Sequence, residues 1–192
     1  MHLEKIIEDL EAEDEVEGPP QSRIGKNSSK PARGRRFSLP PGVHLQDKMR
    51  GNPDTGIRVG SGTGLVNVGL QLTSEAKDKT VIFPAGLLLV PKDNNTQNGL
   101  LVQEVVIIIP AHSEQKWILQ SYCANSNLSE AYKSDEFEFC LVLRESKYLE
   151  FFELLKGKTI SDEAALTVQD AVWELTNRGF LERETLDRIR EI

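Results

Sequence analysis

The sequence predicts a mostly β fold with helices appended at its C-terminal side. Short apolar runs follow one another at a spacing of roughly ten residues between Leu65 and Cys123, without helical patterns between them. From Ser146 onward the apolar residues recur with helical periodicity instead. Short strands without intervening helices favour a sandwich. We therefore expect an α+β chain, in which a β-sandwich is followed by C-terminal helices.

The charges divide the chain into an extension and a domain. The 192 residues carry a net charge of -7 and suffice for one domain with an extension. Residues 1–20 hold eight acids and one lysine, whereas residues 21–50 hold eight Lys and Arg and one aspartate. Residues 21–56 are rich in Ser, Pro, Gly, Asn and Arg, a composition typical of disordered arms. We expect a disordered charged extension over residues 1–56, with a short acidic helix over residues 2–17, and a folded domain over residues 57–192.

The strands are expected where polar and apolar residues alternate or where a short run is wholly apolar. Residues 65–72 alternate as a strand with one buried face does. Further strands are expected at residues 80–83, at 87–90, at 100–109 as one or two strands, and at 116–123. Residues 137–143 fit either a last strand or the start of a helix, and the periodicity leaves both open.

Three helices are expected after these strands. Residues 146–155 have apolar residues at helical spacing, and Gly157 would end that helix. Ser161 is a favourable N-cap for the next helix, with Asp162 and Glu163 in its first turn, and residues 177–179 would close it. Residues 181–192 form the last expected helix, with Leu186 and Ile189 as its apolar residues.

Gln169 stands out on the middle helix because it lies inside the apolar sector. At 3.6 residues per turn it falls between Ala165, Val172 and Trp173, while Asp170 falls on the opposite side. A buried amide needs hydrogen-bond partners, since each polar group left unpaired costs about 1 to 3 kcal/mol. We therefore expect a specific partner for Gln169.

Two motifs together resemble the signature segments of bacterial surface thioester domains. The motifs are Tyr122-Cys123 at a strand end and Val168-Gln169-x-Ala171-Val172-Trp173 on a helix. In that family an aromatic-Cys motif and an apolar-Gln-x-Ala-apolar-Trp motif supply an internal Cys–Gln thioester. The segments Phe83-Pro84-Ala85-Gly86 and Ile109-Pro110-Ala111 are also similar to bacterial β-sandwich proteins that end in such a helix.

The resemblance implies a role for four residues. Cys123 would be the thiol and Gln169 the acyl donor, while Tyr122 and Trp173 would shield the bond. A lysine amine on a partner protein could open the thioester and become attached, as in covalent adhesion. The resemblance implies a protein at the cell surface or a secreted one.

The same residues permit other interpretations. Gln169 could pair with a backbone group at a sheet edge and join helix to sheet, and Cys123 could be a small buried hydrophobe, as free cysteines often are. The protein would then be a non-covalent structural or protein-interaction module. In an exported protein, Cys123 and Cys140 could form a disulfide. A hairpin over residues 111–122 could bring His112 beside Cys123 as a nucleophile pair.

Several function classes are not favoured by the sequence. No His, Cys, Asp and Glu cluster has metal-ligand spacing, and residues 60–64 are glycine-rich but precede a strand, so no metal, cofactor or enzyme activity is expected. The basic residues 21–50 lack aromatics apart from Phe37, so no nucleic-acid partner is expected. No run of about 18 apolar residues predicts a membrane span. The acidic N-terminus does not resemble a signal peptide, which indicates a cytoplasmic protein unless a leader has been removed.

Overall fold

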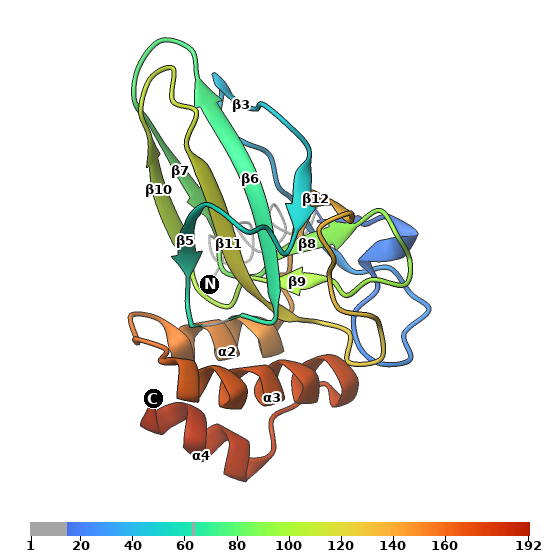
Figure 1. Cartoon of the computed structure of the whole chain (residues 1–192). Coiled ribbons are helices and arrows are strands. Elements are labelled where there is room, and N and C mark those ends of the chain that lie inside the picture. The colour runs from blue at the N-terminus through green and yellow to red at the C-terminus, as the bar shows by residue number, and fades with distance from the viewer. Residues whose placement is uncertain (1–14, 63) are drawn as a thin grey trace, which may run out of the picture.

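Most of the chain forms a β-barrel with three helices packed across one end (Figure 1). The computed structural model describes residues 15–62 and 64–192. Its strands are β1 (Glu15–Glu17), β2 (Arg33–Arg36), β3 (Val43–Leu45), β4 (Met49–Gly51), β5 (Ile57–Gly60), β6 (Val66–Ser74), β7 (Lys79–Phe83), β8 (Leu87–Pro91), β9 (Gly99–Leu100), β10 (Val105–Ile109), β11 (Lys116–Cys123) and β12 (Glu136–Val142). A 3-10 turn, η1 (Pro20–Ser22), precedes β2, and the helices are α2 (Ser146–Leu155), α3 (Asp162–Arg178) and α4 (Arg183–Glu191).

The mostly β fold with C-terminal helices is confirmed, but the sheet is a barrel rather than a clear sandwich. Its six strands follow the order β12, β4, β6, β11, β9 and β8, and β8 pairs with β12 to close the ring. The short strand β4 bridges β6 and β12. Because β4 comes from the segment expected to be an extension, the sequence pattern lacked the strand that joins β6 to β12 in this ring.

The described part of the expected extension belongs to the folded domain. Strand β1 pairs with β2, β2 pairs with β12, and β3 pairs with β6. These strands have three or four residues each, too few to show a period, and they are held largely through their backbones. The folded domain therefore includes the residues from Glu15 onward, whereas Ile57 was expected as its first residue. Of the helix expected over residues 2–17, residues 15–17 form strand β1, and the rest lies outside the described residues.

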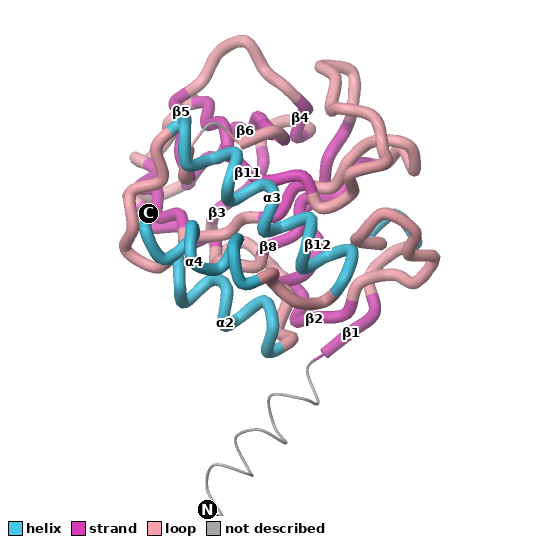
Figure 2. The backbone as a smooth tube through the Cα atoms, turned by 90° about the horizontal axis from the view of Figure 1, so that it is seen from below, coloured by secondary structure: helices cyan, strands magenta, loops and turns pink. Residues whose placement is uncertain are grey.

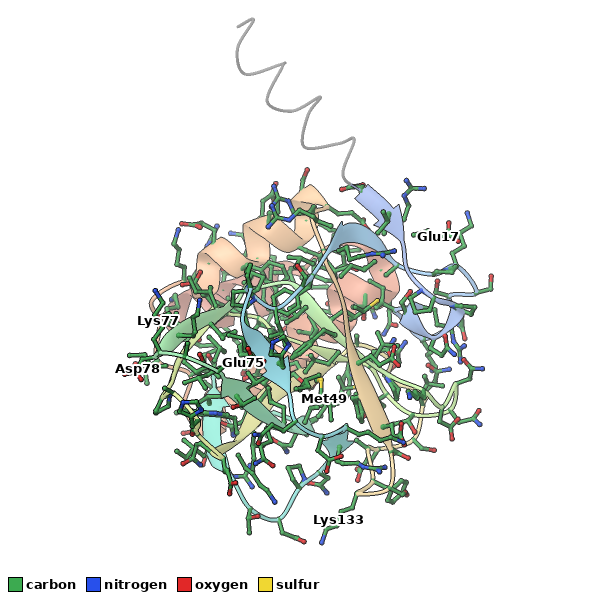
Figure 3. All side chains as sticks on the ribbon, turned by 90° about the horizontal axis from the view of Figure 1, so that it is seen from above. Glu17, Met49, Glu75, Lys77, Asp78 and Lys133 are labelled. Atoms are coloured by element: carbon green, nitrogen blue, oxygen red, sulfur yellow. The ribbon has the colours of Figure 1, made fainter. Side chains whose placement is uncertain are left out.

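Two apolar cores lie on either side of the barrel wall. Strand β8 is buried on both faces, with Leu87 and Leu89 in the barrel interior and Leu88 and Val90 against the helices. Seen from the end opposite the helices, Met49 lies near the middle of the barrel, whereas Lys133 lies at its rim (Figure 3). Neighbouring residues on β11 alternate in the same way, with Tyr122 in the core next to the helices and Cys123 in the barrel interior.

The helices agree with the expected boundaries and cover one end of the barrel (Figure 2). Ser161 caps α3 by accepting a hydrogen bond from the Ala164 backbone N–H at 3.1 Å. Gly179 ends α3 in the left-handed conformation, at φ 84°. Of residues 137–143, which the periodicity left open, residues 137–142 belong to strand β12, and Leu143 follows its end.

An ion trio joins the three strands where the barrel closes. The Glu136 carboxylate on β12 lies 2.6 Å from the Lys48 ammonium beside β4 and 2.9 Å from the Lys92 ammonium after β8. Hydrogen bonds from Lys48 and then Lys92 lower the pKa of Glu136 from 4.5 to about 2.

The Glu136 carboxylate should make stability depend on pH. Because its pKa is lower in the folded chain, its contribution is complete above pH 4.5 and is lost as the pH falls towards 2. We expect Glu136→Gln to be less stable than the wild type at neutral pH, with the gap closing between those two values. Urea unfolding at several pH values measures the gap, and a gap that stays constant down to pH 2 would contradict the assignment.

Candidate functional site

The site lies where the end of β11 meets the buried face of α3, beneath the barrel (Figure 1). Gln169 is only 2% exposed and projects from α3 toward Cys123, the last residue of β11. Its Oε1 accepts a hydrogen bond from the Cys123 backbone N–H at 2.8 Å. Its Nε2 donates to the Cys123 carbonyl oxygen, also at 2.8 Å. The expected partner of Gln169 is thus Cys123.

The Gln169 amide acts as a short strand partner for the end of β11. An amide offers one acceptor and donors in a geometry like that of a peptide group, so it can satisfy both backbone groups of one residue. The buried glutamine therefore ties helix α3 to the barrel and leaves the Cys123 backbone fully paired.

The Cys123 side chain points into the barrel interior and is fully buried. Burial raises the pKa of its thiol, while the Trp173 indole N–H and a hydrogen bond from the Asn125 backbone N–H act in the opposite direction. The Asn125 N–H donates to the Cys123 Sγ at 3.3 Å. The pKa of the thiol therefore lies above its ordinary value, and one N–H group, that of Asn125, donates to its sulfur.

Trp173 lies one helical turn after Gln169 and packs against the same interior core as Cys123. Its indole Nε1 is buried and has no hydrogen-bond partner of ordinary geometry among the described residues. This N–H nevertheless opposes the rise in the pKa of Cys123. Trp173 thus forms one wall around the thiol.

Tyr122 occupies the other side of the barrel wall, in the core shared with the helices. It is 1% exposed, and its hydroxyl donates to the Ser61 carbonyl oxygen at 3.0 Å. Burial raises the pKa of this hydroxyl. The structure thus brings all four residues expected from the two motifs to one end of the barrel.

Two asparagines beside the site had no expected role. The Asn125 side-chain oxygen accepts from the Asn98 backbone N–H at 3.0 Å, and the Ala124 N–H donates to the Asn98 carbonyl oxygen at 2.9 Å. Both asparagines are fully buried. Asn98 belongs to an Asn-Gly pair that the sequence indicates as a turn, and the only signal for Asn125 was its place two residues after Cys123.

The other candidate residues lie apart from this pair. His112 precedes β11 and Cys123 ends it, so the length of an eight-residue strand separates them and the nucleophile pair does not form. Both cysteines are free in the described chain, and Cys140 packs beside the helix-side core. Burial raises the pKa of Cys140 to about 11. Within residues 15–62 and 64–192 there is no metal-ligand cluster, and no helix has the length and apolar character to cross a membrane.

The chemical capacity of the site follows from this geometry. The Gln169 carboxamide is held out of water against the backbone of the residue that bears the thiol, and its oxygen already accepts a backbone hydrogen bond. A donor at that oxygen would stabilise negative charge developing on it. Comparisons with protein families, curated proteins and solved structures found no match to this chain.

Proposed function

We propose that the protein is a binding module that stores an internal thioester between Cys123 and Gln169 and uses it to attach covalently to a primary amine on a partner. The observation that carries the proposal is the reciprocal pairing of the Gln169 amide with the Cys123 backbone at 2.8 Å. This pairing holds the side-chain carbonyl of Gln169 beside the residue that bears the thiol. The likeness of both motifs to thioester domains supports the same chemistry.

Formation of the thioester is a balanced acyl transfer. The Cys123 sulfur attacks the side-chain carbonyl carbon of Gln169, and charge develops on Oε1, which the Cys123 N–H stabilises. The C–N bond breaks, the thiol proton moves to the departing nitrogen, and ammonia leaves. The water-free surroundings protect the product from hydrolysis. A primary amine later attacks the same carbon, which yields an amide on Gln169 and returns the free thiol.

A second function, a non-covalent interaction module, is favoured by a different observation. Both polar atoms of the Gln169 side chain already have good partners, and burial raises the pKa of the thiol that would attack. In this alternative the pair only joins α3 to the barrel, and partners bind at the surface without a chemical step.

Uptake of an amine separates the two functions. The full chain is incubated with methylamine, and the modified peptide is located by mass spectrometry. We expect one methylamine on Gln169 and one newly free thiol at Cys123, in equal amounts, and no uptake in Cys123→Ala or Gln169→Ala. Cys140→Ala is the matched control and should react like the wild type. Absence of uptake by a folded wild-type protein would favour the non-covalent module.

A further inference from the structure

The Cys123–Gln169 pair is closed off from solvent. Cys123 is 0% exposed and Gln169 only 2% exposed. The same burial that would protect a thioester from water would also exclude an amine carried by another molecule. A segment of the chain must therefore move before an amine can reach the Cys123–Gln169 pair. This inference rests on the proposed function, because it concerns access to the proposed reaction.

Residues 21–26, which we call the strap, cross the chain segment that follows Cys123. The Gly25 N–H donates to the Ala124 carbonyl oxygen at 2.8 Å. The Arg23 carbonyl oxygen accepts from the side-chain amides of Asn98 and Asn125, each at 2.7 Å. The strap therefore holds the residues next to Cys123 through hydrogen bonds to its own backbone.

The far end of the strap rests on the C-terminal end of α3, one turn beyond Trp173. The Lys26 N–H donates to the Asn177 Oδ1 at 2.6 Å. Gly25 passes so close to α3 that a Cβ atom there would lie 2.4 Å from the Thr176 carbonyl oxygen. In Figure 1 the blue segment at the right descends toward this end of α3. The strap thus bridges the two elements that carry Cys123 and Gln169.

The strap has little apolar contact with the rest of the protein, so it can be released at a low cost in free energy. Ile24 is its one apolar side chain, and it is only partly buried against the helix-side core. Residues 23–26 also form several hydrogen bonds, including one from the Arg23 guanidinium to the Asn94 carbonyl oxygen at 2.7 Å. Each such bond contributes about 0.5 to 1.5 kcal/mol, and water can replace it when the segment lifts. Segments with few apolar contacts open at a lower free energy than the core.

We propose that the strap is a displaceable cover, and that its release from Ala124 and from the end of α3 admits amines to the Cys123–Gln169 pair. Ser22, which is fully buried and accepts from the Ala32 N–H at 3.1 Å, anchors the start of the strap. Opening then requires residues 23–26 to lift while the strands β1 and β2 stay paired.

A reversible disulfide, which we call the pin, tests whether the strap covers the pair. Lys26→Cys with Asn177→Cys, in a Cys140→Ala background, places two thiols where the Lys26 N–H now meets the Asn177 side chain. We expect the oxidised protein to react with methylamine at least about tenfold more slowly, because the pin removes the open state. Reduction with a phosphine should restore the rate. Equal rates with the strap pinned and released would overturn the proposal.

The readout remains informative if no thioester forms. Cys123 is then a free thiol, and its alkylation by iodoacetamide, located by peptide mass, replaces methylamine uptake as the measure of access. The pin should slow this alkylation by the same factor. The proposed function fails if the mass of the untreated protein equals that of the sequence, without the loss of one ammonia. The cover fails if the pin does not change the rate of reaction.

A glycine pair supplies a second, independent test. Gly25→Ala introduces a Cβ against the Thr176 backbone at a residue with φ +88°, so it should loosen the strap and speed the reaction of the site. Gly157→Ala is the matched control, because Gly157 also has a positive φ, +72°, but no atom lies within 4 Å of a Cβ there. We expect acceleration in the first variant only. Equal rates in both folded variants would count against the cover.

Discussion

Replacing Gln169 by alanine is expected to lower the free energy of unfolding by roughly 3 to 5 kcal/mol. The substitution leaves the Cys123 N–H and carbonyl oxygen buried without their partners, and each such group costs about 1 to 3 kcal/mol. It also leaves a cavity between α3 and the barrel. Urea unfolding followed by circular dichroism measures the loss.

The neighbouring residue on α3 provides the control for this effect. Asp170 is exposed, and Asp170→Ala should change stability by no more than about 0.5 kcal/mol. A Gln169→Ala loss smaller than about 1 kcal/mol would mean that the amide does not tie the helix to the barrel.

Cys123→Ala separates the covalent from the non-covalent form of this tie. The variant keeps the backbone groups that bind Gln169 and removes only the sulfur. A thioester would close a loop across 46 residue positions, and loss of such a cross-link should cost about 4 kcal/mol by the chain-entropy estimate for a disulfide. Without the cross-link, only the small cost of a missing buried sulfur is expected.

Replacing Trp173 by alanine is expected to open the site and to raise its rate of reaction with methylamine by about tenfold or more, because water and small amines then reach the Cys123–Gln169 pair. Trp173 packs against the core that contains Cys123, and its removal takes away one wall of the thiol's surroundings. The rate of methylamine uptake, or of Cys123 alkylation where the thiol is free, measures the change.

The chain offers two informative comparisons for Trp173. Trp117 also packs against the interior core, but it lies near the opposite end of β11, so Trp117→Ala should leave the rate unchanged. Trp173→Phe retains an aromatic wall without the indole N–H, and it should react close to the wild-type rate if shielding is the main role. Equal acceleration by the alanine variants of both tryptophans would indicate general loosening of the barrel.

The sequence predicted those elements whose residues carry a local period. The α3 boundaries follow from Ser161, from the apolar stripe and from Gly179, and the structure confirms them. Strand β6 alternates along its whole length and was equally clear. The burial of Gln169 followed from its angle on the helical wheel, because a polar residue in an apolar sector needs a specific partner.

The remaining features depend on contacts between distant parts of the chain. Strand β4 joins β6 to β12 with only three residues, which are too few to show a period in the sequence. The strap was expected to be disordered because its polar composition is that of a linker, yet the side chains of Asn98 and Asn125 hold its backbone. Such backbone contacts leave little trace in the identity of the strap residues, so sequence patterns cannot reveal them.

The intact mass of the untreated 192-residue chain tests the central claim most directly. A Cys123–Gln169 thioester predicts a mass lower than that of the sequence by one ammonia, with the full mass in Cys123→Ala after allowance for the substitution. The mass of the Cys140→Ala control should be lower by the same ammonia. A wild-type mass equal to that of the sequence, together with a Cys123 thiol that can be alkylated after unfolding, would contradict the thioester and leave the pair as a buried tie between α3 and the barrel.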